Sequence, residues 1–183
     1  MNDLPYDVFR FDRNHFARLE QTGAFNGVRV ELIDGVILRK LRTTPARAHA
    51  VVALTHALTA QVREDGALFP GCPLALSALN EPSPAFSIVA RRYLDDEDQW
   101  NRASLVVEVS DASLDFDLGL KADLYAAAKI PEYWVIDLAH QKLVVHLAPK
   151  RGHYTRISRL GRGKSVTSTV APKVTIAVDS LFR

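Results

Sequence analysis

The chain is organised around the segment LVVEVSDASLDFDLGLKADLY, from Leu105 to Tyr125. This stretch begins with an apolar run that has the composition of a buried strand and is interrupted by one carboxylate, Glu108. Because side chains alternate along a strand, Glu108 shares a face with Val106 and Ser110. A buried, ionised Glu without a partner is costly, so such a residue is usually retained by a metal, a cation or a catalytic role.

The second half of the stretch predicts a helix, with Ser113 as its N-cap. Lys121 falls inside the apolar arc of this helix, and Asp117 lies one turn before it. If the helix packs on the strand that carries Glu108, an inward acid and an inward lysine converge. The same spacing also fits a plain buried ion pair, or a lysine whose long stem reaches past its neighbours to water. The arc is made up of Leu114, Phe116, Leu118, Leu120, Leu124, Tyr125 and Ala127.

The remaining elements follow from periodicity and turn residues. We expect helices over 11–21 and 46–64, a hairpin around Asp34 and Gly35, turns over 66–73, and a charged surface connector over 91–102. Further strands are expected at 73–78, 86–90, 133–137, 142–147, 154–158 and 174–178. The strand–helix–strand unit over 105–137 implies a right-handed crossover within one mixed sheet. These elements predict an α/β fold in a single domain, residues 1–183.

A glutamate and two histidines within these elements are further candidate site residues. By alternation, Glu31 is a solvated residue of the first hairpin strand, on the face opposite Val30 and Leu32. His49 and His56 lie nearly on one side of the long helix, but they lack the i,i+4 spacing of a zinc helix. We therefore interpret both histidines first as packing or supporting residues.

The composition is that of a soluble globular protein, with 48% apolar and 24% charged residues. Cys72 is the only cysteine, which excludes an internal disulfide and a cysteine-based metal cluster and fits a reducing cytosol. No run of about 18 apolar residues is present, and the N-terminus is too polar for a secretory signal. We expect a cytoplasmic protein with no membrane partner.

The basic residues are unevenly distributed. Between Asp137 and Asp179 there is no acidic residue, whereas the segment holds eight Lys or Arg residues. Such a basic C-terminal third could face nucleic-acid phosphates. The alternative is a set of solvated hairpin loops.

The motifs taken together resemble one known family. Ile130–Asp137, read as IPEYWVID, follows the strand and helix just described, and a Glu-Leu-Ile-Asp-Gly motif begins at Glu31. This set is similar to the Uma-type, DUF820-like family of restriction endonucleases, a branch of the PD-(D/E)XK nuclease superfamily, and the resemblance extends from about Phe9 to Phe182. It implies a restriction-endonuclease-like core, a mixed β-sheet flanked by helices. The residues that carry it are Glu31, Glu108, Ser110, Asp117, Lys121, Tyr125 and the 130–137 segment.

The resemblance implies a division of roles in a metal-dependent DNA endonuclease that hydrolyses phosphodiesters with Mg²⁺ or Mn²⁺. Glu108 is the central metal ligand, Glu31 the auxiliary acid and metal ligand, and Lys121 the catalytic lysine, shifted from the strand to the helix. The usual lysine position falls at Ser110. Supporting roles fall to Asp117 and Tyr125, which position Lys121 or contact substrate, and to Ser110 and His49. The resemblance also implies DNA as partner and a homodimer.

One departure from the family motif bears on activity. Pro84-Ala85 stands where the family has Pro-Asp, so Ala85 replaces a metal-binding Asp. A methyl group cannot ligate a cation, and this predicts impaired hydrolysis. The alternative is a catalytically inactive nuclease fold that binds nucleic acid or a protein partner.

Overall fold

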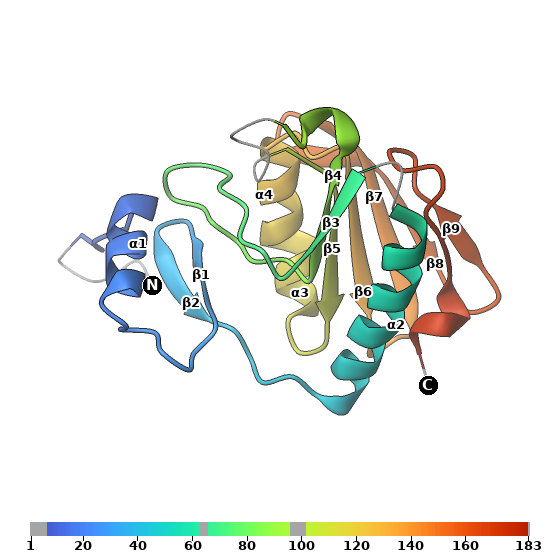
Figure 1. Ribbon diagram of the computed structural model, residues 1–183, viewed down its shortest axis with the longest axis horizontal. Coiled ribbons are helices and arrows are strands. Elements are labelled where there is room, and N and C mark those ends of the chain that lie inside the picture. The colour runs from blue at the N-terminus through green and yellow to red at the C-terminus, as the bar shows by residue number, and fades with distance from the viewer. Residues whose placement is uncertain (1–6, 63–65, 96–101, 183) are drawn as a thin grey trace.

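A six-stranded mixed sheet lies at the centre of the computed structural model, which describes residues 7–62, 66–95 and 102–182 (Figure 1). β5 and β6 are parallel neighbours, and the other adjacent pairs are antiparallel. The predicted α/β class, a mixed sheet flanked by helices, is therefore confirmed. In spatial order the strands are β3 (Gly66–Pro70), β4 (Phe86–Ala90), β5 (Ala103–Ser110), β6 (Glu132–Asp137), β7 (Lys142–Lys150) and β8 (His153–Leu160).

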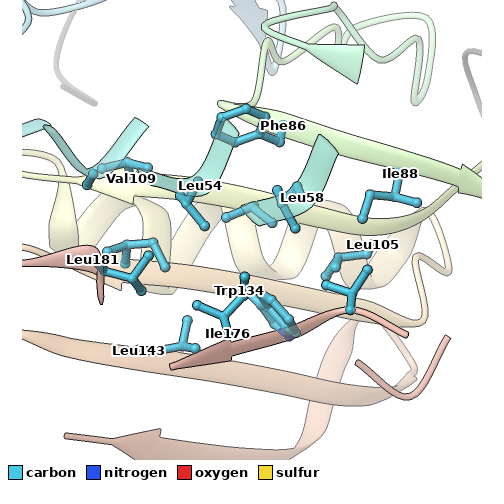
Figure 2. Packing of buried hydrophobic residues seen from close by; sticks show 14 of the residues in the cluster. Leu54, Leu58, Phe86, Ile88, Leu105, Val109, Trp134, Leu143, Ile176 and Leu181 are labelled. Carbon is cyan, nitrogen blue, oxygen red and sulfur yellow. The ribbon is translucent and has the colours of Figure 1, made fainter. Parts of the chain in front are cut away.

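β5 is the buried strand that the apolar run predicts, and all eight of its residues are buried. Its alternate side chains serve two separate cores. Leu105 and Val107 pack in a cluster with α2 (Pro45–Val62), to which Leu54 and Leu58 contribute (Figure 2). On the opposite face, Val106 packs in a second cluster with α4 (Ala122–Ala127). Glu108, on the face of Val106, thus points toward the side of the sheet that α4 covers.

The helical connection between β5 and β6 differs from the regular helix that the spacing predicts. It consists of α3 (Leu114–Phe116), a π-helical turn, η3 (Asp117–Lys121), and α4. A π turn adds a residue to the turn and rotates the side chains that follow it. Leu120 and Ala127, expected to face inward, are therefore exposed, whereas Ala122 and Ala126 are buried. Asp117 and Lys121 are both buried, as expected of Lys121.

The N-terminal region forms a small unit beside the sheet (Figure 1). α1 (Arg13–Gln21) is capped by Asp12, whose carboxylate accepts a hydrogen bond from His15 N. β1 (Val30–Ile33) and β2 (Val36–Arg39) form the predicted hairpin, and Asp34 and Gly35 both have the positive φ of its tight turn. This hairpin is joined to the 71–85 loop by the Leu32–Glu81 bridge.

The burial of Glu31 differs from the solvated position that strand alternation predicts. Glu31 is buried rather than solvated, because the loop before β4 covers the face of β1 on which it lies. A strand also forms at β3, where turns were expected, whereas residues 73–78 form no strand. Pairing with β4 stabilises β3 in spite of its Gly and Pro termini.

The C-terminal segment covers the α2 side of the sheet. β9 (Ser165–Thr167), β10 (Thr175–Ala177) and η4 (Val178–Leu181) place Ile176, Val178 and Leu181 in the α2 cluster (Figure 2). Two predicted boundaries lie partly outside the described residues: the end of the long helix at 63–64 and part of the 91–102 connector, which begins with η1 (Arg91–Tyr93). No helix in the described ranges is both long and apolar enough to cross a membrane.

Candidate active site

A pocket of about 490 Å³ lies between the β1–β2 hairpin, the start of α2 and the segment after β5. Four charged side chains of this pocket are almost completely buried: Glu31, Glu108, Asp117 and Lys121. Glu31 comes from β1, Glu108 from β5, and the other two from η3. Three separate elements therefore bring three carboxylates and one ammonium group to one place.

Lys121 is the centre of this group. Its Nζ lies 2.8 Å from Glu108 Oε1, 3.0 Å from Glu31 Oε2 and 3.8 Å from Asp117 Oδ1. Lys121 and Glu108 are each only 2% exposed. The convergence of Glu108 with Lys121 that the sequence predicts is thus present, and Glu31 joins it.

The carboxylates have further donors that hold them in place. Tyr125 donates a hydrogen bond from its hydroxyl to Glu108 Oε1 at 3.2 Å. Ser110 and Ser113 donate from their hydroxyls to Asp117 Oδ2 at 2.5 and 2.7 Å. Ser113 therefore bonds to a side chain of the next turn instead of capping the helix as predicted, since its hydroxyl makes no capping bond to a backbone N–H.

Lys40 is a member of the site that the sequence analysis missed. It follows β2, and its Nζ lies 3.3 Å from Glu31 Oε2 and donates to the Ser83 carbonyl. The backbone N–H of Ser83 also donates to Glu31 Oε2, at 3.1 Å. A signal for Lys40 was present: Glu31 pairs with Leu38, so Lys40 is a diagonal neighbour of Glu31 on the same face of the hairpin.

The charges of the cluster depend on each other. Burial opposes ionisation of Lys121, but Glu108, Glu31 and Asp117 outweigh it and raise its pKa above the ordinary value of 10.5. Burial likewise opposes ionisation of Glu108, yet Lys121 and Lys40 leave its pKa below the ordinary value. Burial, together with the charge on Glu108, raises the pKa of Asp117. Lys121 is therefore a permanent ammonium group and cannot serve as a base at neutral pH.

The lining of the pocket is cationic as a whole. It includes six Lys or Arg side chains against four Asp or Glu side chains. The cations are Arg29, Arg39, Lys40, Arg42, Arg47 and Lys121. None of the eight basic residues between Asp137 and Asp179 lines this pocket, so the positive charge at the site comes from the N-terminal hairpin and the start of α2.

Two positions singled out in the sequence lie elsewhere. His49 lines a separate pocket, of about 280 Å³, together with Leu138 and Phe182, and does not line the pocket that contains Glu108. Ala85, one residue before β4, lines a neighbouring pocket of about 710 Å³. That pocket shares Arg29, Lys40 and Arg47 with the candidate site, so position 85 lies beside the site without lining it. The supporting role implied for His49 stays a prediction.

The side chains present do not form a complete site for a divalent cation. Among residues 7–62, 66–95 and 102–182, no three His, Cys, Asp or Glu side chains are arranged to hold a metal ion. Glu31 and Glu108 have the oxygen donors that Mg²⁺ or Mn²⁺ prefers, but each is already bonded to an ammonium group. The donor set therefore does not fit a cation held by three carboxylates.

Comparisons with known proteins agree with this picture of the fold. The model of the Uma2 family, described as "Putative restriction endonuclease", matches residues 13–179. A crystal structure titled as a putative nuclease belonging to DUF820, from Anabaena variabilis ATCC 29413, is similar to this chain with a TM-score of 0.71 at 13% identity. The similarity covers 94% of this chain and 97% of that one, and at this identity it shows a common fold. Among curated proteins, no sequence matches.

Proposed function

The chain belongs to the Uma2 family of restriction endonucleases, and from this membership we propose that it acts on DNA as an endonuclease with impaired phosphodiester hydrolysis. The observation that carries the proposal is the convergence of Glu31, Glu108 and Lys121 at the floor of a cationic pocket. A nuclease must attract a polyanion and stabilise extra negative charge on one phosphate, and this pocket offers both properties.

Lys121 has the position and charge to stabilise extra negative charge on a phosphate. Three carboxylates hold its ammonium group in one place, so it needs no rearrangement to stabilise charge that develops on a phosphate. Because its pKa is raised, it contributes this charge throughout the neutral pH range. The carboxylates of Glu31 and Glu108 position Lys121, and the Tyr125 hydroxyl in turn holds Glu108.

The proposed impairment of hydrolysis follows from a missing metal ligand at position 85. Ala85 contributes no oxygen ligand where the family resemblance implies an Asp, and Glu31 and Glu108 alone make an incomplete set for the predicted Mg²⁺ or Mn²⁺. Changing even an outer partner of a metal typically costs about 10–100-fold in affinity or activity, and loss of a direct ligand should cost at least as much. We therefore propose weak cleavage by the natural chain.

Relaxation of supercoiled plasmid DNA in Mn²⁺ tests the proposal. We expect Ala85→Asp to cleave at least about 10–100-fold faster than the natural chain, and Glu31→Gln, which keeps the shape of the side chain, to remove this gain when combined with it. Lys121→Ala should abolish cleavage, provided that circular dichroism shows a folded protein. Equal cleavage by the natural chain, Glu31→Gln and Lys121→Ala would contradict the assignment of this site.

A binding protein without hydrolytic activity is the second candidate, and the cationic lining of the pocket favours it. This candidate predicts no cleavage by any variant but salt-sensitive binding of nucleic acid, because phosphate contacts release counterions. Absence of binding at low salt would leave a protein-binding module. The homodimer implied by the family resemblance and the cytoplasmic location expected from the composition remain predictions, which size-exclusion chromatography and cell fractionation can test.

A further inference from the structure

We propose that Lys40 takes the place of a divalent cation at Glu31, so that the pocket binds a phosphate of a nucleic-acid strand without a metal ion. The nature of the ligand rests on the proposed function, whereas the role of Lys40 rests on the geometry alone. The inference explains why a site with three buried carboxylates is nevertheless cationic.

The ammonium group of Lys40 lies in an oxygen-lined position. Its partners are the Glu31 carboxylate, 3.3 Å away, and the backbone carbonyl of Ser83. Carboxylate and carbonyl oxygens are also the ligands that hard divalent cations take in proteins. Glu31 Oε2 accepts from Lys121 at 3.0 Å and from Ser83 N at 3.1 Å as well, so this oxygen has no open position for a metal.

The small side chain at position 85 leaves room for the Lys40 ammonium group beside Ser83. Lys40, Ser83 and Ala85 all line the same neighbouring pocket, of about 710 Å³. The methyl group of Ala85 brings neither charge nor bulk to this region, and it packs against the apolar cluster under α2. Position 85 thus supplies no oxygen ligand that would hold a metal ion beside the Lys40 ammonium group.

The other acids of the pocket are already occupied. Asp117 accepts from Ser110 and Ser113, and Asp111 accepts from the hydroxyl of Thr44 at 2.7 Å. Lys40 and Lys121 together balance the two charges of Glu31 and Glu108, so a divalent ion would add two positive charges next to two ammonium groups.

Three arginines of the lining remain available for an anion. The guanidinium groups of Arg39, Arg42 and Arg47 form no hydrogen bond or ion pair with any described residue, and all three line the pocket. Guanidinium groups bind phosphate oxygens in a forked geometry, often through two hydrogen bonds. A phosphodiester is therefore the anion class that this lining fits, given the proposed function.

Metal binding tests the role of Lys40 directly. Mn²⁺ titrations followed by electron paramagnetic resonance would compare the natural chain, Ala85→Asp, Lys40→Met and the double variant, with Lys40→Gln as a second substitution in case Lys40→Met is poorly folded. We expect the affinity for Mn²⁺ to rise from the natural chain to Ala85→Asp, and to rise again, at least tenfold, from Ala85→Asp to the double variant. Equal Mn²⁺ affinity for Ala85→Asp with and without Lys40 would overturn the inference.

Binding of a nucleic-acid strand in the presence of EDTA tests whether the pocket holds a phosphate without a metal ion. A labelled single-stranded oligonucleotide should bind the natural chain, and Lys40→Met should weaken binding and reduce the salt slope by about one. Lys150→Met, which removes an exposed lysine of β7 outside the pocket, should change neither. Binding that requires added Mn²⁺ would refute the inference. Failure to bind with or without Mn²⁺ would refute the proposed nucleic-acid function, while the Mn²⁺ titrations would still decide the role of Lys40.

Discussion

Replacement of Lys121 by Met is the perturbation that the structure predicts most sharply. Met fills a similar volume but has no charge, so the variant leaves Glu108 buried without its closest cation. Glu31 keeps Lys40 and Ser83 N as partners, whereas Glu108 keeps only the Tyr125 hydroxyl among its hydrogen bonds within the described residues. The loss should therefore come mainly from Glu108.

The expected magnitude follows from the burial of both groups. Removing one partner of a buried ion pair costs about 3–5 kcal/mol, because it leaves an uncompensated charge. For a chain of this length, 1 kcal/mol shifts Tm by about 2–4 °C, so Lys121→Met should lower Tm by about 6–20 °C. Lys150→Met removes an exposed charge and should change Tm by little.

The pH dependence distinguishes loss of the ion pair from a packing defect. In the natural chain the pKa of Lys121 is raised and that of Glu108 is lowered. The pair therefore contributes its full stability between the ordinary values of 4.5 and 10.5; this stability is lost as pH falls through the lowered pKa of Glu108 or rises through the raised pKa of Lys121. In Lys121→Met, burial without its closest cation raises the pKa of Glu108 above that in the natural chain, so protonation relieves the defect at mildly acidic pH.

Urea unfolding followed by circular dichroism at pH 8 and pH 5 measures both effects. We expect the difference in unfolding free energy between the natural chain and Lys121→Met to be smaller at pH 5 than at pH 8. The double variant Lys121→Met/Glu108→Gln should recover part of the loss, because Gln is neutral. A loss below about 1 kcal/mol at pH 8, or a loss independent of pH, would refute the reasoning about the buried cluster.

Three further predictions concern the stability of the fold. Glu132 is fully buried and accepts four hydrogen bonds from side chains and backbone, so Glu132→Ala should cost about 3 kcal/mol or more in urea unfolding; Glu132→Gln, which keeps some of the bonds, should cost less. A Cβ at Gly66 would lie 2.0 Å from the Val89 carbonyl oxygen, so Gly66→Ala should cost about 1–3 kcal/mol and speed amide exchange in β3; Gly161→Ala, which meets no atom within 4 Å, is the matched control, and equal losses in the two variants would contradict the expected clash. Burial lowers the pKa of His146 to about 4, so the folded state binds fewer protons and stability should fall as pH decreases from 6.5 to 4. His146→Leu should flatten this part of the pH profile, and an unchanged profile would show that another group titrates.

The elements predicted correctly from sequence are those with strong local signals. The apolar run around Glu108 is β5, the Asp34-Gly35 turn forms the expected hairpin, and the helix expected over 11–21 is α1. Lys121 lies on the inward face, as its position among apolar residues indicated. Each of these signals depends on residues within a few positions of one another.

Other features required information that periodicity does not contain. A regular 100° step predicted Leu120 as inward, but the π turn rotates it to the surface. β3 has weak strand propensity and forms because β4 is available as a partner. Glu31 appeared solvated by alternation, since nothing in its own strand indicates that the loop at Ser83 covers it.

Local patterns in the sequence were enough to predict the strand–helix–strand unit and the inward position of Lys121, because hydrophobic spacing and turn chemistry act over short distances along the chain. The resemblance of its motifs indicated the family, which the family model confirms. Only the tertiary structure decided that Glu31 meets Lys121, 90 positions away, and that Lys40 shares the same carboxylate oxygen. The contact between groups so far apart depends on how the hairpin, the loop before β4 and η3 pack together. That packing determines whether two carboxylates remain open to a metal ion or are neutralised by ammonium groups.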